Sequence, residues 1–331
     1  MATTRIDWVD RCKAIAIIGV VYGHVGLFSM QHWGVFSIIQ DSFCMAFFFF
    51  LSGFFVRPIQ DNRAVFNAVK KKFLRLGAPF CFFGLTYTVL IKGDIPFWSL
   101  FYYESDIFHN GYWFLLVLLE MHVLLLVLQF FCNIFKMDNV KIGGCLLVIV
   151  WGLLHFLNQT HFFPETVNTA LSLPLLRYYL PFFVIGFFLS NFLNKEDLRS
   201  LFSSRWLFTI CSIIFLSLLF LRERFELDFL PLVYILAITG ILSVIYLVTV
   251  FESNNSFNRC LSYCGRHTLE IYVLHYFFLP TDLVFLKVLI HDNANIALEF
   301  ILFLFITATV VILSLFLSRI LKQNLLIKYI L

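Results

Sequence analysis

The chain has 331 residues, of which 61% are hydrophobic and only 13% are charged, and Phe alone accounts for 44 residues. Soluble globular domains average about 45–50% apolar and about 25% charged residues. The few polar side chains could not cover so much apolar surface in water. The composition therefore excludes a soluble enzyme, a nucleic-acid-binding module and a disordered protein, and it indicates a lipid bilayer as the surroundings.

Continuous apolar runs along the chain predict membrane-spanning helices, whereas an outer-membrane barrel would show short alternating segments. We predict an all-α, polytopic membrane helix bundle of about ten transmembrane helices. Residues 1–331 are expected to form a single domain, with no separate soluble domain. The predicted spans are 12–30, 36–56, 73–92, 112–133, 140–157, 174–193, 206–221, 229–251, 268–290 and 297–319.

The 24 Lys and Arg residues are distributed unevenly over the segments between these spans. With the N-terminus placed inside, only Lys92, Arg177, Arg222, Arg224 and Lys287 fall on outer segments, and all the other cations fall on inner ones. Cytoplasmic loops of membrane proteins carry such an excess of cations. The pattern predicts that both termini are cytoplasmic, that the number of spans is even, and that the protein lies in the cell membrane as a multi-pass protein.

The first predicted span carries a cation near its start and an imidazole near its middle. His24 follows Lys13 by eleven residues, which places it ~16 Å further along a helix. Lys13 can extend its ammonium to the inner interface, and Gly23 permits a close approach beside His24. Imidazole is the side chain best suited to proton transfer near neutral pH. His24 is therefore a candidate general base, although a core histidine bonded to a neighbouring helix explains the pattern equally well.

The second predicted span offers a partner for this histidine. The turn between the first two spans is centred near Trp33, and His24 and Asp41 lie at similar distances from it. Antiparallel neighbours at equal distance from a turn lie at equal depth, so Asp41 could accept a hydrogen bond from His24 and fix its tautomer. The two helix faces could also point apart. Further along the same span, Ser52 and Gly53 interrupt a Phe-rich run, and close helix packing is the simpler role for them.

A cation-rich segment precedes the third predicted span and is expected to be a cytoplasmic loop. Lys72 and Arg75 are three residues apart and would share a helix face. Such cations anchor a chain to lipid headgroups or bind a phosphorylated ligand, and both interpretations stay open.

Other ionisable residues fall within predicted spans, where each is costly unless it is paired or hydrated. Glu120 lies seven residues after Trp113, and Glu270 and His275 share the ninth span. Each is a functional candidate or a member of a packing network. The eight Cys residues are scattered, and no zinc-peptidase, α/β-hydrolase or phosphate-loop motif occurs, so no metal is predicted.

Taken in order, several of these elements resemble the integral-membrane acyltransferase family 3. The elements are Lys13 with His24 after ten intervening residues, Leu51–Phe55, Lys72-x-x-Arg75 with Pro79, Trp113–Leu115 and Leu269–His275. Two departures occur: Cys44-Met45-Ala46 stands where members often have His-Met-Pro, and Lys72 stands where they often have arginine.

The resemblance implies transfer of an acyl group, commonly acetyl, from cytoplasmic acyl-CoA to a hydroxyl of an extracytoplasmic or lipid-linked glycan. Acyl-CoA and the glycan would be its partners, with no bound cofactor. His24 would be the base with Asp41 as its partner, and Lys72 and Arg75, with Lys13 or Arg11, would bind the CoA phosphates. Further candidates for acceptor binding or support are Asp10, Ser52, Trp113, Glu120, Glu270 and His275.

Two other functions fit the same bundle. One is a transporter or exporter of a surface polysaccharide or lipid-linked sugar, and the other is a structural subunit of a polysaccharide-assembly complex. Matching broken helices in two inverted halves would favour transport, and the sequence shows no such pairing. A structural subunit would leave His24 unexplained.

Overall fold

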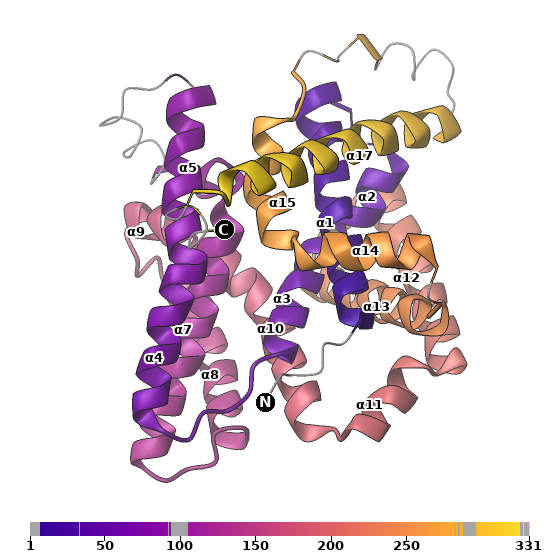
Figure 1. The fold of residues 1–331 in the computed structure, drawn as a ribbon. Helices are drawn as coiled ribbons and strands as arrows, with labels where there is room; N and C mark the ends of the chain where they lie inside the picture. The colour runs from indigo at the N-terminus through magenta and orange to yellow at the C-terminus, as the bar shows by residue number, and fades with distance from the viewer. Residues whose placement is uncertain are drawn as a thin grey trace. The chain divides into compact units, whose positions relative to one another are not determined.

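A computed structural model describes residues 7–32, 34–91, 93, 105–253, 255–281, 283, 285–286, 296–324, 327 and 331 (Figure 1). In these ranges the chain is helical and contains no strand. Trp33, the predicted centre of the first turn, lies outside the described residues, as do four of the cations used in the charge count: Arg5, Lys92, Lys287 and Lys328.

Within the described part of the chain, nine helical segments are long and apolar enough to cross a membrane. The polytopic, all-helical fold predicted from composition is therefore confirmed, and each segment overlaps one predicted span. The segments are Asp7–Met30, Val35–Phe54, Asn62–Ile91, Trp113–Ile134, Lys141–Gln159, Leu173–Phe192, Arg205–Phe225, Leu230–Val250 and Ile296–Leu321.

The chain divides into two compact units, with the boundary inside helix α3 (Cys44–Phe54). Unit 1 comprises Met1–Phe48 and Lys195–Ile320, and unit 2 comprises Phe49–Asn194 and Leu321–Leu331.

Unit 1 is built around α1 (Asp7–His24), which continues as a π-helix, η1 (Val25–Met30). Helices α2, α13, α14 and α15 pack against α1, and α12 pairs with α13. The other helices of unit 1 are α2 (Val35–Asp41), α11 (Lys195–Phe202), α12 (Arg205–Phe225), α13 (Leu230–Val250), α14 (Ser256–Arg266), α15 (Thr268–Leu274) and α17 (Ile296–Leu321). Figure 1 shows α17, in yellow, crossing the end of α1 and α2.

The approach of α14 to α1 depends on a glycine. A side chain at Gly265 would overlap the backbone carbonyl of Asp10, so only hydrogen in place of a side chain permits this contact. The closeness brings the start of α15, and the residues that follow it, beside the middle of α1.

The ninth predicted span, 268–290, is wrong as a continuous helix. Helix α15 covers Thr268–Leu274 and is followed by a 3₁₀ turn, η4 (His275–Phe277), after which residues 278–281 are not helical. Pro280 follows, and proline disfavours helical backbone at the residue before it. Ten helical residues reach about 15 Å, which is half of the hydrocarbon thickness.

The second span is interrupted between α2 and α3 at Ser42 and Phe43. The Ser42 hydroxyl donates to the Ile38 carbonyl at 2.8 Å. A serine that bonds back to the preceding turn in this way bends helices. The bend separates the direction of α2 from that of the Phe-rich helix α3.

Unit 2 contains one long helical run, Asn62–Ile91, of which the sequence predicted only the part from residue 73 onward. Residues expected to be a cation-rich loop form α4 (Asn62–Lys72), which continues through the π-helix η2 (Phe73–Gly77) into α5 (Ala78–Ile91). Asp61 begins α4 by accepting a hydrogen bond from the Ala64 amide at 2.8 Å. The run of 30 residues is about 45 Å long, so about ten residues project beyond the hydrocarbon.

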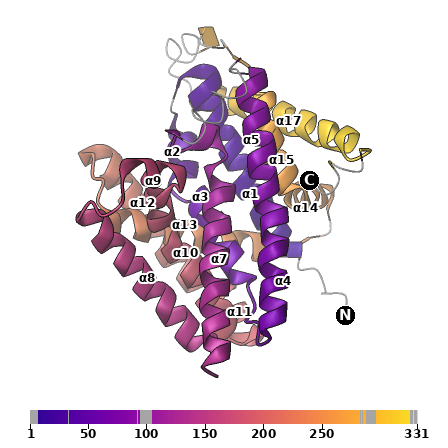
Figure 2. The same cartoon turned by 90° about the vertical axis from the view of Figure 1, so that its left-hand side faces the viewer.

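The rest of unit 2 surrounds this run. Figure 2 shows α4 and α5 end to end, with α7 beside them, and contacts between α4, η2 and α7 agree. The remaining elements are η3 (His109–Gly111), α7 (Trp113–Ile134), α8 (Lys141–Gln159), α9 (Glu165–Ala170) and α10 (Leu173–Phe192).

The close packing expected at Gly53 is confirmed in unit 2. A methyl group on Gly53 would overlap the carbonyl of Phe183 in α10, and one on Gly186 would overlap the carbonyl of Phe50 in α3. The two glycines therefore bring the backbones of α3 and α10 into contact.

Candidate functional site

His24 lies where α1 changes into the π-helix η1. A π-turn inserts an extra residue into a helix and often occurs at functional sites. The imidazole is only partly buried, and the exposed Phe28 packs edge-on against it at a ring distance of 5.4 Å. The helix therefore presents His24 at an irregular point that a ligand can reach.

The nearest partner of His24 is another histidine, contributed by η4. His24 Nδ1 lies 2.8 Å from His275 Nε2, and the two ring planes are 8° apart. The hydroxyl of Tyr276 lies 3.4 Å from the other nitrogen of His24, Nε2. All three residues belong to unit 1, and His275 is fully buried.

The partners of His275 assign the protons of this pair. Its Nδ1 lies 2.7 Å from the Tyr272 carbonyl and 3.1 Å from the Ile271 carbonyl. Because carbonyl oxygens only accept hydrogen bonds, Nδ1 of His275 carries the proton and its Nε2 is an acceptor in the neutral ring. His24 then donates from Nδ1, which leaves the lone pair of its Nε2 facing the Tyr276 hydroxyl. His24 is thus held in the tautomer that a general base needs.

The predicted pair of His24 with Asp41 is wrong. Both nitrogens of His24 face η4, and the charged neighbours of Asp41 are instead Arg222, Glu223 and Asp228. The depth was predicted well, because a side chain on Gly23 would overlap the amide of Gln40. Asp41 follows Gln40 by one residue, about 100° around the helix, and so leaves the face that meets α1. The geometric basis for a catalytic Asp41 is therefore lost.

The opposite end of α1 carries the two cations proposed for the donor. Arg11 is 4% exposed and pairs with Glu252, with Nη2 and Oε1 2.9 Å apart. The side chain of Lys13 is 35% exposed, with its Nζ 3.9 Å from the carboxylate of the buried Asp10. Lys13 is accessible to a ligand, whereas the Arg11 guanidinium is committed to Glu252.

Glu270 has a local partner rather than a place beside His24. The carboxylate is buried and lies 3.0 Å from Nδ1 of His267, one turn earlier. A buried carboxylate with such a neighbour fits the packing-network interpretation of this residue.

In unit 2, Lys72 and Arg75 form a cationic pair on the long run from α4 to α5. Arg75 is exposed and Lys72 is partly exposed, and the described residues supply no ion-pair partner for either. Arg75 lies in η2, between α4 and the apolar helix α5.

The other predicted site residues of unit 2 have different surroundings and do not form one site with each other. Trp113 stacks on Tyr179 at 5.3 Å and packs near Phe49, which is an aromatic packing role. Both oxygens of Glu120 are buried, with no hydrogen-bond partner in the described part of the chain. Ser52 precedes the contact at Gly53, and no bond of its hydroxyl is seen among the described residues.

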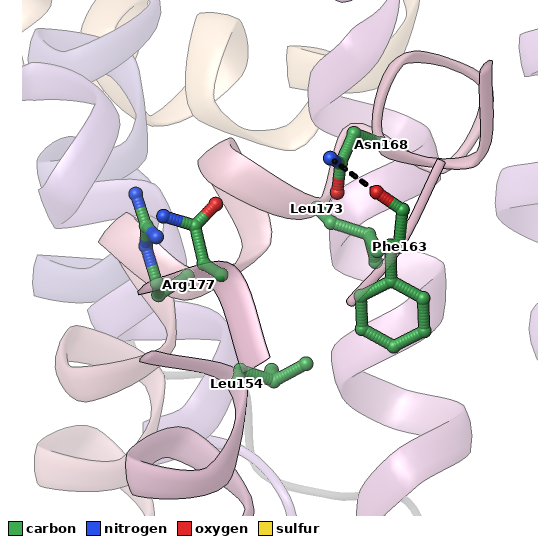
Figure 3. A pocket seen from close by; sticks show the side chains of 6 residues that line it. Leu154, Phe163, Asn168, Leu173 and Arg177 are labelled. Atoms are coloured by element: carbon green, nitrogen blue, oxygen red, sulfur yellow. Dashed lines mark hydrogen bonds between the residues drawn. The ribbon is translucent and has the colours of Figure 1, made fainter. Parts of the chain in front are cut away.

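A small hollow in unit 2 contains none of the predicted site residues (Figure 3). Its empty volume is about 210 Å³, including the part open to solvent, and the Asn168 amide donates to the Phe163 carbonyl at its rim. The lining residues are Leu154, Asn158, Phe163, Asn168, Leu173 and Arg177.

No cluster of three or more His, Cys, Asp or Glu side chains suited to a metal ion occurs in the described ranges, and all eight cysteines are free thiols. The sequence interpretation missed Tyr276, although it directly follows His275. It also missed Glu299, although a carboxylate inside the predicted span 297–319 satisfies the rule that singled out Glu120 and Glu270.

A search of curated proteins and a search of solved structures returned no match. The model of the acyltransferase 3 family, described as an acyltransferase domain, matches residues 6–319, which include His24, His275 and every other candidate residue. The chain therefore belongs to the acyltransferase 3 family and is a multi-pass membrane acyltransferase.

Proposed function

We propose that this protein transfers an acetyl group from cytoplasmic acetyl-CoA to a hydroxyl of an extracytoplasmic or lipid-linked glycan, in the cell membrane. The observation that carries the proposal is the His24–His275 pair. It fixes one tautomer of an accessible imidazole within the membrane-embedded family domain. Such a group suits the removal of a proton from an alcohol.

The reaction follows from the free nitrogen. His24 Nε2 takes the proton of the acceptor hydroxyl. At the same time, the oxygen of that hydroxyl attacks the carbonyl carbon of the acetyl-CoA thioester. The carbon–sulfur bond of the resulting tetrahedral species then breaks, the ester forms, and the CoA thiolate receives the proton that His24 carries. His275 accepts the hydrogen bond from His24 Nδ1 throughout, which stabilises the imidazolium as it forms.

The hydroxyl of Tyr276 marks the position of the acceptor. It lies 3.4 Å from Nε2, a long distance for an O–H···N bond, so an acceptor hydroxyl can replace it at the base. Displaced, the phenol stays beside the reacting carbon and can donate to the oxygen that becomes negatively charged.

The donor binds through cations that the protein leaves accessible. Lys13 lies on the same helix as His24, ~16 Å away, which suits the extended arm of CoA between its phosphates and its thioester. Lys72 and Arg75 of unit 2 are a second group of accessible cations suited to phosphate. Lys13→Met tests the first group, with the half-saturating acetyl-CoA concentration as the readout.

Membranes, labelled acetyl-CoA and the host's surface glycan test the proposal. Wild type transfers label to the glycan, and His24→Ala lowers the rate about 10²- to 10⁴-fold, which is the usual contribution of a general base. The matched control is His161→Asn, because His161 is exposed and asparagine tolerates its positive φ of 50°. Both variants are first shown to insert and to elute as monodisperse protein.

Two results contradict the proposal. Full transfer by a folded His24→Ala protein removes His24 as the base. Absence of transfer by wild type, combined with loss of surface glycan on deletion of the protein, replaces acyl transfer with export.

A further inference from the structure

Glu299 lies in the first turn of α17, and its side chain is only 6% exposed. One oxygen, Oε2, lies 3.4 Å from Nε2 of His32. The other, Oε1, is buried and has no hydrogen-bond partner among the described residues. A carboxylate in the first turn does complement the helix dipole, but that role needs no burial. A buried acceptor left without a donor is costly and calls for a ligand.

Other buried polar groups near Glu299 also lack hydrogen-bond partners among the described residues. Tyr22, Ser29, Ser37 and Thr307 are buried, and each has a hydroxyl oxygen without a partner in the described part of the chain. These residues come from α1, η1, α2 and α17, all within unit 1.

Contacts and helix spacing place Glu299, Tyr22, Ser37 and Thr307 at one interface. Glu299, Phe303 and Thr307 follow one another at intervals of four and share a face of α17. The Phe303 ring lies 5.2 Å from the Tyr22 ring. A side chain on Gly26 would come within 3.2 Å of Ser37 Oγ and 2.9 Å of the Phe303 ring.

A glycine makes room for the carboxylate itself. A methyl group on Gly34 would overlap the Glu299 carboxylate, so the charge lies directly over the backbone where α2 begins. Glycine at this position keeps the space beside His32 open for the carboxylate.

The chemistry of Glu299 and the hydroxyl groups near it identifies a class of ligand. The negative charge of Glu299 repels phosphate and other anions, and a divalent metal would require further acidic or histidine ligands, which the described residues do not supply. Hydroxyl groups both donate to a carboxylate and accept from Tyr, Ser and Thr. Aromatic rings beside them, with Phe36 and Phe300 4.4 Å apart, offer apolar faces to the C–H groups of a ring. A sugar meets both requirements.

His32 and Glu299 lie where the acceptor substrate is expected to approach His24. His32 is 26% exposed, follows η1, and lies eight residues after His24, at the opposite end of α1 from Lys13. With the donor cations at one end of α1 and His24 between, the acceptor enters from the end that carries His32 and Glu299.

We propose that Glu299, oriented by His32, binds hydroxyl groups of the acceptor sugar and so determines which glycan is acylated. This inference rests on the proposed function. It assigns recognition of the acceptor to residues separate from the His24–His275 pair.

The test separates recognition of the acceptor from chemistry. Purified protein in nanodiscs receives labelled acetyl-CoA and glycan extracted from the host surface, and each substrate is titrated at saturating levels of the other. Glu299→Gln keeps the size of the side chain and loses its charge. The half-saturating glycan concentration is expected to rise about ten- to a hundredfold, the usual value of a hydrogen bond to a charged group, while that for acetyl-CoA is unchanged.

Ser37→Ala is a milder variant of the same interface and is expected to raise the half-saturating glycan concentration several-fold. Glu165→Gln is the control, because Glu165 is an exposed first-turn carboxylate of α9. A second readout needs no reaction: the glycan alone should raise the melting temperature of wild type and of Glu165→Gln, and not that of Glu299→Gln.

Unchanged half-saturation by glycan, or equal protection of Glu299→Gln and wild type, overturns the inference and assigns the interface to packing. If wild type transfers no acetyl group, the proposed function fails, and the melting-temperature comparison still decides whether Glu299 binds the glycan.

Discussion

At the scale of single residues, His275 takes the place that a carboxylate holds in many catalytic bases. Its Nδ1 proton is bound by carbonyls of its own helix, so its Nε2 only accepts, and His24 must donate to it from Nδ1. A neutral acceptor avoids placing a second charge inside the membrane, where each unpaired charge is costly. In return, His275 stabilises the imidazolium of His24 less than a carboxylate would.

Removal of this acceptor should therefore affect the rate more than binding. We expect His275→Ala to lower kcat about 10²- to 10³-fold, because the free ring of His24 no longer keeps the required tautomer. The half-saturating acetyl-CoA concentration should stay near the wild-type value. His275→Gln, whose side-chain oxygen can accept in place of Nε2, should recover at least about tenfold of the loss. Equal activity of the Ala and Gln variants would show that His275 is only a packing residue.

The ion pair between Arg11 and Glu252 leads to a second prediction at this scale. Arg11 is buried, whereas the side chain of Glu252 is 61% exposed. Glu252→Ala leaves a buried cation without its partner and should destabilise the protein by about 1–3 kcal/mol. Arg11→Met removes the charge, keeps the volume, and should be close to neutral. Thermal denaturation of the solubilised proteins measures both effects.

Arg11→Met, compared with Lys13→Met, also decides the role of Arg11 in donor binding. If Arg11 is structural, Arg11→Met leaves the half-saturating acetyl-CoA concentration unchanged. Lys13→Met should raise it, because Lys13 is the accessible cation of α1. A large rise with Arg11→Met would return Arg11 to the phosphate site.

At the scale of elements, hydrophobic runs were sufficient to place nine helices, since each needs about 20 apolar residues and little else. The face that each helix turns toward its neighbour was harder to predict. Turn symmetry placed Asp41 at the depth of His24, but whether residue 40 or residue 41 faces α1 depends on a rotation of about 100°. The π-helix after His24 and the bend at Ser42 alter such rotations without changing hydrophobicity.

The candidate site shows the same division. His24 could be found from its own helix, because a histidine in an apolar run is conspicuous. Its partner is 251 residues away, and no local pattern joins two residues so distant. Pro280 did offer a local signal that the ninth span ends early, since proline disfavours helix before it.

The contact between α3 and α10 gives a prediction about elements. Gly53→Ala would push a methyl group into the Phe183 carbonyl, so the two helices must separate, and we expect a loss of several degrees in melting temperature or loss of folded protein. Gly152→Ala in α8 is the matched control, because nothing lies within 4 Å of its added methyl group. That change should stabilise the protein slightly, by about 0.4–1 kcal/mol. Equal melting temperatures for the two variants would refute the close backbone contact.

At the scale of the whole molecule, the distribution of cations and the number of spans constrain each other. Nine candidate spans occur in the described residues, and the segment 268–290 is described only in part. If that segment does not cross, Arg319, Lys322 and Lys328 move to the outer side and Lys287 moves to the inner side. Three cations beside a final span on the outside oppose the positive-inside rule.

We therefore expect the C-terminus to be cytoplasmic, with 268–290 and its surroundings completing an even number of crossings. Fusions of alkaline phosphatase, which is active only outside, and of a fluorescent protein, which folds only inside, measure this directly. A fusion after Glu252 should report the inside and one after Arg224 the outside under either span count, so these two are the controls. A fusion after Leu331 decides between the counts. Fluorescence there supports ten crossings, whereas phosphatase activity there means nine, and the short helix α15 with His275 then enters the bundle from one side without crossing it.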